Sequence, residues 1–233
     1  MISIIIPAYN EENRISGTLQ SISDFFEDKG VDYEVVVAVD GCRDRTREVV
    51  EGFCKRNKKI KLTYKDGRSG KGGALLRGFL NSKGDKIVFA DSDNAAKAEE
   101  LLKLADALDR YDVAWGRRRF RYKKDNPPLY RSLIGKSYGY ISMFVFFSRF
   151  YDVQCGYKAF RKRVLDEVFP KVKTLGIEYD LDLLTRIRGA GYKIVRPDIW
   201  WRHVEGSPSY NPINHFFTYT KELLKIRLRA FNS

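Results

Sequence analysis

Short apolar runs rich in β-branched residues alternate with segments of helical spacing through the first half of the chain. Five such runs predict buried strands, at 2–6, 34–39, 60–64, 86–90 and 112–116. Apolar residues three or four positions apart predict helices between them, around 15–26, 49–53, 75–79 and 98–108. Because strand and helix alternate, we expect right-handed βαβ units and a mostly parallel α/β sheet with helices on both faces.

The second half of the chain follows a different pattern, in which basic and aromatic residues are concentrated. Residues 117–124 hold six bases and no acid, and a break at 125–128 follows them. Residues 130–151 are rich in Leu, Ile, Met, Phe and Tyr, and they would pack on the core, on a second subunit or on a membrane. Residues 214–230 mix apolar and basic positions, which predicts an amphipathic helix suited to an anionic membrane surface.

Composition and charge narrow the class of protein. The chain has 233 residues, 43% of them hydrophobic, so it can bury a substantial core, and a disordered basic tail is excluded. Its formal net charge is +13, with −6 in the first forty residues and +19 in the remainder, so we expect an anionic partner for the later part. Three cysteines without a C-x-x-C pair favour a reducing cytosolic setting over a disulfide framework or a zinc ribbon. No apolar run approaches the roughly 20 residues of a membrane-spanning helix.

Polar residues follow the predicted strands at the sheet edge where ligands bind in such folds. Tyr9 and Glu11 follow the first strand, and Asp40 comes directly after the second. Asp91 and Asp93 follow the fourth strand, and both can present oxygens to Mg²⁺ or Mn²⁺ while substrate phosphates complete the shell. For an isolated pair of this kind, the alternative is a solvated turn with a helix cap.

A glycine-rich turn at 70–73 contains Lys71. It departs from the P-loop pattern, because Gly72 follows the lysine and Lys65 stands where the first glycine is required. A helix N-terminus with glycines and a lysine is still suited to an anion. The alternative is a plain glycine-rich turn into the predicted helix.

Several of these segments resemble family 2 glycosyltransferases of the GT-A fold, and among them the synthases that attach a sugar to a polyprenyl phosphate. The segments follow one another as in that family, at 4–12, 70–74 with 77–78, 91–93, 152–160, 179–184 and 205–207. The resemblance covers nearly the whole chain, so it favours a metal site over a solvated turn at Asp91 and Asp93. The implied fold is a GT-A, Rossmann-like sheet flanked by helices.

Within that family, the chain is more similar to the branch that transfers glucose than to the branch that transfers mannose. Ala95 stands where mannosyl relatives usually carry Gln, whereas Lys97 and the Gln-Cys-Gly of 154–156 are similar to the glucosyl branch. We therefore expect a uridine diphosphate sugar in preference to a guanosine diphosphate sugar. Val39 is a departure, because the family often has an aspartate there, and it leaves the details of base recognition open.

The resemblance also implies roles for the residues at the strand ends. Pro7, Tyr9, Glu11 and Asp40 would hold the nucleoside. Lys71 would lie nearby and take part in binding the nucleotide sugar.

The same resemblance implies catalytic roles for five further residues. Asp91 and Asp93 would hold Mg²⁺ or Mn²⁺ on the diphosphate, and the sugar would be transferred with inversion. Arg118 and Arg131 would bind the phosphate of a lipid acceptor; the alternative is that the basic run 117–124, which contains Arg118, is a solvated face. Asp180 would orient an acceptor or a sugar hydroxyl, or else be a carboxylate on a helix surface.

In terms of domains, residues 1–213 would form the GT-A unit, with 1–116 as its nucleotide-binding half and 117–213 as its acceptor half. Residues 214–233 would form the membrane-surface helix. The expected function is hexose transfer from UDP-glucose or a related UDP-sugar to dolichyl or polyprenyl phosphate, at the cytoplasmic face of a membrane. A GDP-mannose-dependent enzyme and a soluble saccharide acceptor are the alternatives. Nucleic acid is not an expected partner, because no reader motif is present and the acidic strand ends repel phosphates.

Overall fold

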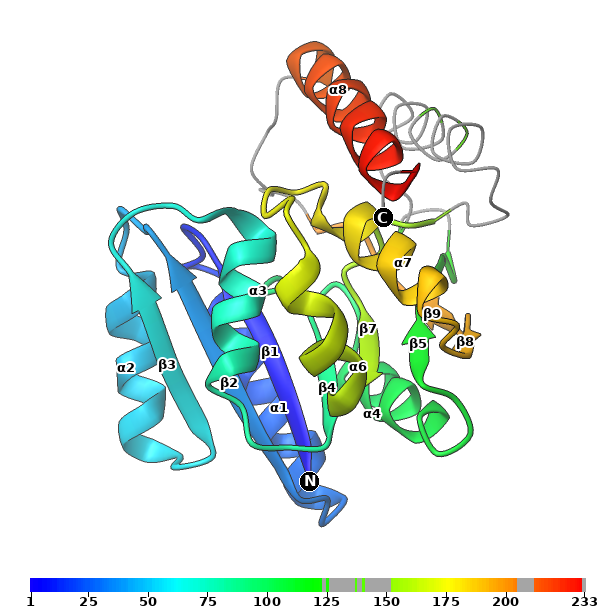
Figure 1. Cartoon of the computed structure of the whole chain (residues 1–233). Helices are drawn as coiled ribbons and strands as arrows, with labels where there is room; N and C mark the ends of the chain where they lie inside the picture. Colours follow the sequence, from blue (N-terminus) through cyan, green and yellow to red (C-terminus); the bar gives the residue numbers. More distant parts are fainter. Residues whose placement is uncertain (123–124, 126–136, 138–139, 141–151, 205–211, 232–233) are drawn as a thin grey trace.

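The computed structural model describes residues 1–122, 125, 137, 140, 152–204 and 212–231, and for 212–219, 230 and 231 it describes the backbone only. Within these residues the chain forms a central sheet with helices on both of its faces (Figure 1). Apart from Ser137 and Tyr140, the apolar segment predicted at 130–151 lies outside the described residues.

A mixed seven-stranded sheet forms the centre of the described structure, in the order β3-β2-β1-β4-β7-β5-β8. Its strands are β1 (Ile2–Ala8), β2 (Tyr33–Asp40), β3 (Ile60–Lys65), β4 (Lys86–Phe89), β5 (Val113–Trp115), β7 (Lys158–Arg161) and β8 (Ile194–Val195). β7 runs antiparallel to both of its neighbours, and the other neighbouring pairs are parallel. The predicted mostly parallel sheet is therefore confirmed.

The helices divide between two cores, one on each face of the sheet. One face is covered by α1 (Ile15–Asp28), α2 (Thr46–Arg56) and α4 (Ala98–Ala107). The other is covered by α3 (Gly70–Leu80), α6 (Lys162–Val168), a 3₁₀ turn (Phe169–Lys171) and α7 (Tyr179–Gly189). Successive side chains of a strand point to opposite faces, so β1 supplies both cores, as the alternation of its isoleucines shows.

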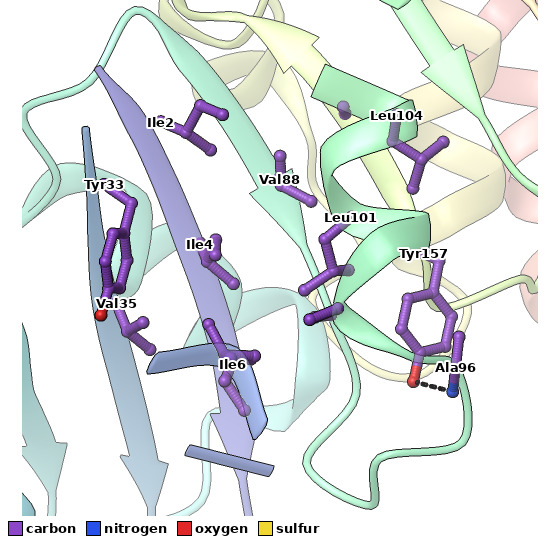
Figure 2. Packing of buried hydrophobic residues seen from close by; sticks show 14 of the residues in the cluster. Ile2, Ile4, Ile6, Tyr33, Val35, Val88, Ala96, Leu101, Leu104 and Tyr157 are labelled. Atoms are coloured by element: carbon purple, nitrogen blue, oxygen red, sulfur yellow. Dashed lines mark hydrogen bonds between the residues drawn. The ribbon is translucent and has the colours of Figure 1, made fainter. Parts of the chain in front are cut away.

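Figure 2 shows part of the first core, in which apolar side chains of β1, β2 and β4 meet those of α4. Tyr157 completes it, and its hydroxyl accepts a hydrogen bond from the Ala96 N–H at 3.0 Å. Because this buried hydroxyl satisfies a loop amide, the segment that follows Asp93 is tied to the centre of the sheet.

Two further elements lie outside the central sheet. β6 (Arg117–Arg119) pairs in parallel with β9 (Asp198–Trp200) as a separate two-stranded ribbon. α8 (Pro212–Phe231) confirms the helix predicted at 214–230, and it contacts α7. Its Leu223 and Ile226 are buried in the second core, whereas its Leu224 and Leu228 are exposed.

None of the described helices combines the length and the apolar composition that crossing a bilayer requires.

A buried carboxylate, Glu34, ties the amino ends of the strands together on the edge opposite the predicted site. It lies opposite Ser3 in the β1–β2 register and accepts the Ser3 hydroxyl hydrogen at 2.6 Å. Lys61 and the Lys83 N–H also donate to it. Burial alone would raise the pKa of Glu34, but the bonds from Lys61, Ser3 and Lys83 outweigh that effect and hold the pKa below its usual value.

The Glu34 network predicts a pH-dependent loss of stability on substitution. A carboxyl group with a depressed pKa stabilises the fold above its unfolded pKa of about 4.3, and this contribution is lost as the pH falls through the folded value. We expect Glu34→Gln to lower the free energy of unfolding by about 1–3 kcal/mol at pH 7, and the difference from wild type to shrink near pH 3. Urea titrations at both pH values measure this. Exposed Glu99→Gln is the control and should change stability by less than about 0.5 kcal/mol. An equal loss at both pH values would contradict the role of the charge.

Candidate active site

The carboxyl ends of three adjacent parallel strands, β2, β1 and β4, meet at one edge of the sheet. The loop after β1 carries Tyr9 and Glu11, β2 ends at Asp40, and the loop after β4 carries Asp91 and Asp93. The sheet order therefore brings together the residues that the sequence places at separate strand ends.

Asp91 forms an ion pair with Lys71 of α3, whose Nζ lies 2.7 Å from Oδ1. Burial would raise the pKa of Asp91, but the charge and hydrogen bond of Lys71 outweigh it and hold that pKa below its usual value. Burial would likewise lower the pKa of Lys71, but the Asp91 and Asp180 carboxylates outweigh it and raise that pKa. Both members of the pair are therefore charged at neutral pH.

The backbone of Gly156 lies close to the carboxylate of Asp91. A Cβ atom at Gly156 would lie 2.0 Å from Asp91 Oδ2, much closer than two nonbonded atoms can approach. Only glycine therefore leaves room for the observed position of Asp91, which explains the glycine in the Gln-Cys-Gly segment.

Asp93 adds a second carboxylate on the same loop. Its Oδ1 accepts a hydrogen bond from the Ala95 N–H at 3.1 Å, and burial together with the charge of Asp91 raises its pKa to about 6. Carboxylate oxygens are the hard donors that Mg²⁺ and Mn²⁺ prefer, and a divalent cation would relieve the repulsion that this pKa reports. The two residues thus fit such a cation.

The protein ligands for a cation are few, however, in the part of the chain that the structure describes. No group of three or more His, Cys, Asp or Glu side chains gathers there as a closed metal site. Oxygens of a bound substrate would have to complete the coordination shell, as is common for Mg²⁺ at phosphate sites.

The amino end of α3 binds an anion that belongs to the protein itself. Asp40, which is 4% exposed, accepts hydrogen bonds from the N–H groups of Ser69 and Gly70 at 3.0–3.1 Å. Arg77 of the same helix also donates to it at 3.4 Å. Asp40 thus neutralises the positive end of α3. A nucleoside that bound Asp40 would have to share the carboxylate oxygens that already accept hydrogen bonds from Ser69 and Gly70.

The next two glycines of the turn bring α3 into close contact with the segment before α7. The N–H groups of Gly72 and Gly73 donate to the carbonyls of Gly176 and Leu175 at 3.3 and 3.2 Å. A Cβ atom at Gly72 would lie 2.5 Å from Cβ of Tyr179. The prediction that this turn binds an anion is wrong for these N–H groups, because protein carbonyls accept from them, and the glycines serve close packing instead.

Asp180 of α7 is buried, so the alternative of a carboxylate on a helix surface is wrong. Its Oδ1 lies 2.7 Å from Nζ of Lys158 on β7, whose side chain is 0% exposed. The Lys158 ammonium also lies 4.7 Å from the centre of the Trp115 ring and 5.5 Å from that of Tyr179. Sequence reasoning missed Lys158. Its position between Tyr157 and Ala159, with Phe160 next, is the signal of a buried lysine that needs a carboxylate.

The aromatic and acidic residues after β1 also have partners that the sequence did not predict. The guanidinium of Arg68 lies 3.8 Å from the centre of the Tyr9 ring. Glu11 accepts two hydrogen bonds from Arg14, at 2.7 and 2.8 Å, and burial nonetheless raises its pKa. Pro7 lies within β1 and is half-buried. The two arginine partners, Arg68 and Arg14, lie three or more residues from the residues they contact, in loops that carry no recognisable motif.

Arg118 lies on β6 with its guanidinium engaged by a carboxylate of the protein. Asp152 accepts from the Arg118 backbone N–H at 3.0 Å and from its Nη2 at 2.5 Å. A phosphate would therefore have to share Arg118 with Asp152. Arg131, the other residue predicted to bind the lipid phosphate, lies outside the described residues, as does the segment 205–207.

Comparison with known proteins identifies relatives of this chain. The sequence profile described as Glycosyl transferase family 2 matches residues 3–169. The chain is 31% identical to the dolichyl-phosphate beta-glucosyltransferase of Saccharomyces cerevisiae, covering 97% of this chain and 74% of that protein. The human protein of the same name is 28% identical, with 98% and 75% covered. Glycosyltransferase AglD of Haloferax volcanii is 30% identical over 86% of this chain, which spans about a third (33%) of its length.

Among solved structures, glucosyl-3-phosphoglycerate synthase from Mycobacterium tuberculosis, in complex with Mn²⁺, UDP and phosphoglyceric acid, has the same fold. The TM-score is 0.71 at 20% identity, with 99% of this chain and 78% of that chain covered. This likeness confirms the predicted GT-A fold. The profile match and the yeast relative lead to one conclusion: the chain belongs to glycosyl transferase family 2.

Proposed function

We propose that this protein transfers a hexose, from UDP-glucose or a related UDP-sugar, to dolichyl or polyprenyl phosphate, with inversion at the anomeric carbon. The observation that carries the proposal is the Asp91–Asp93 pair at the carboxyl edge of the sheet. It occurs in a chain that aligns over 97% of its length with a dolichyl-phosphate beta-glucosyltransferase. The Mycobacterium tuberculosis synthase, which shares the fold, is known with Mn²⁺ and UDP-glucose bound, which supports the choice of donor and metal.

Asp91 and Asp93 would hold Mg²⁺ or Mn²⁺ against the diphosphate of the donor. When bound, the cation would act as a Lewis acid that neutralises charge on the departing nucleoside diphosphate. Lys71 stays protonated beside Asp91 and adds a second positive charge at the same place. Tyr9 and Arg68, stacked at the end of β1, offer an aromatic ring and a guanidinium to the nucleoside.

A phosphate acceptor explains why the described site needs no strong general base. The oxygen of a phosphate monoester is already anionic at neutral pH, so no proton has to be removed before it attacks the sugar. Positive charge is needed instead to attract it, and Arg118 stands at the beginning of a basic segment beside the site. Asp180, held by Lys158, would orient an acceptor or a sugar hydroxyl.

Donor and acceptor can be identified in one assay. The purified protein is incubated with polyprenyl phosphate, Mn²⁺ and labelled UDP-glucose, UDP-N-acetylglucosamine or GDP-mannose, and label is counted in the organic phase. In a parallel incubation phosphoglyceric acid replaces the lipid, and label is counted in the aqueous product. We expect lipid labelling from a UDP-hexose. Labelling from GDP-mannose alone would overturn the donor, and label only in a soluble phosphorylated acceptor such as phosphoglyceric acid would overturn the lipid.

Removing the charge of Asp93 should abolish metal-dependent transfer. Asp93→Asn keeps the shape of the side chain but removes a hard anionic ligand, so we expect a rate at least about 100-fold lower at saturating donor. Mn²⁺ titration of the transfer rate measures the effect. Asp85→Asn is the matched control, because its side chain is 86% exposed, and it should behave as wild type. Full activity of Asp93→Asn, or of wild type in excess chelator, would contradict the role of the metal site.

Filling the space next to the Asp91 carboxylate should impair the site without replacing either of the proposed metal ligands. The methyl group of Gly156→Ala would lie 2.0 Å from Asp91 Oδ2, so the carboxylate must leave the position in which it pairs with Lys71. We expect at least about a tenfold loss of transfer and weaker Mn²⁺ dependence. The control is Gly52→Ala in α2, where nothing lies within 4 Å of the added atom and stability should rise by about 0.5–1 kcal/mol. Equal activity of the two variants would show that Asp91 tolerates displacement.

A further inference from the structure

The ribbon formed by β6 and β9 presents two chemically different faces. Its register places Arg117 opposite Asp198, Arg118 opposite Ile199 and Arg119 opposite Trp200. Side chains alternate along a strand, so the central pair points one way and the flanking pairs point the other way. Ile199 is 0% exposed, whereas Trp200 is 45% exposed. We call the first side the inner face and the second the outer face of the ribbon.

The inner face lies against the candidate active site. Arg118 is bound to Asp152, and its guanidinium lies 5.6 Å from the centre of the Trp201 ring. Trp201 in turn forms a β-bridge with Ala96, three residues after Asp93. The loop that carries the paired aspartates and the inner face of the ribbon are therefore in direct contact.

The outer face is basic and aromatic. Arg117 and Arg119 are exposed and share the Asp198 carboxylate, at 2.5 and 3.1 Å. Arg121, also exposed, places its guanidinium 5.4 Å from the centre of the Trp200 ring. Three guanidinium groups against one carboxylate give this face a positive charge around an exposed tryptophan.

We propose that the outer face, formed by Arg117, Arg119, Arg121 and Trp200, docks on an anionic membrane surface. Tryptophan combines a large apolar ring with an N–H donor and is favoured at the boundary between lipid and water. Each guanidinium near anionic headgroups adds attraction of about 1 kcal/mol. Charge and side-chain type therefore both match a layer of anionic lipid headgroups.

This inference rests on the proposed lipid-phosphate acceptor and deepens it. Arg118 is the middle residue of the three-residue strand β6 and points toward the site. Arg117 and Arg119, on either side of it, point outward. If the outer face is docked on the membrane, the phosphate of a lipid could reach Arg118 while the hydrocarbon chain of that lipid stays in the bilayer. The ribbon would then fix the distance between the membrane surface and the paired aspartates.

Vesicle sedimentation of the full chain, without donor or acceptor, tests the docking surface. The vesicles are phosphatidylcholine alone, or phosphatidylcholine mixed with phosphatidylserine. Arg121→Glu changes the face by two charge units, so we expect about 30-fold weaker binding to the phosphatidylserine vesicles, equivalent to about 1 kcal/mol per unit. Trp200→Ala should weaken binding to them about tenfold. Thermal unfolding checks that both variants fold. If Trp200→Ala does not fold, Arg121→Glu still tests the surface, because Arg121 lies outside the paired strands.

Arg56→Glu is the matched control for the charge change. Arg56 is an exposed arginine whose guanidinium lies 4.5 Å from the centre of the Phe53 ring, on α2, at the opposite end of the sheet (Figure 1). It should reduce binding far less than Arg121→Glu. Equal losses in the two variants, or wild-type binding by Arg121→Glu and Trp200→Ala, would overturn the docking surface. Because the assay contains no acceptor, failure of the acceptor assignment would leave its result unaffected.

Discussion

The buried ion pair between Lys158 and Asp180 is the contact on which the arrangement of the site depends. Lys158 lies on β7, between β4 and β5, with its side chain fully buried, and its carboxylate partner comes from α7. An unpaired charge at such a place would cost several kcal/mol, so the pair fixes α7 over the middle of the sheet. Tyr179, next to Asp180, then fixes α3 through the contact at Gly72. The position of Lys71 beside Asp91 follows from this chain of contacts.

A second constraint acts at the other side of α3, where Asp40 accepts from the first N–H groups of the helix. Helix α3 is therefore held at its amino end by β2 and along its first turn by the segment before α7. Neither contact leaves the turn free to fold around a phosphate. The glycines that resemble a phosphate loop in the sequence instead permit close packing, and the lysine among them pairs with the carboxylate of Asp91 in the loop after β4.

Local patterns were sufficient to predict most of the fold and the position of the site, but not how its charges are paired. The apolar runs predicted β1 to β5, and the residues at their ends predicted the edge where Tyr9, Glu11 and the paired aspartates meet. β7 was missed because it is a four-residue strand that begins and ends with a base. Lys158, Arg68 and Asp152 act through partners more than twenty residues away, so no local spacing could have identified those partners. The close contact of Gly156 with Asp91 is equally non-local.

The pairing of charges explains why the proposed cation and the basic surface would serve the same purpose, which is to offset negative charge at the site. Lys71 matches Asp91, Lys158 matches Asp180 and Arg14 matches Glu11, which leaves Asp93 as the additional negative charge among these groups. A diphosphate approaching this edge would be repelled unless a divalent cation came with it. Burial, and after it the charge of Asp91, raises the pKa of Asp93 at the same place. An anionic acceptor meets the same difficulty, and the ribbon that ends beside Ala96 supplies the opposite charge. In the function proposed here, the acidic strand ends and the basic second half would be complementary parts of one site for two anionic substrates.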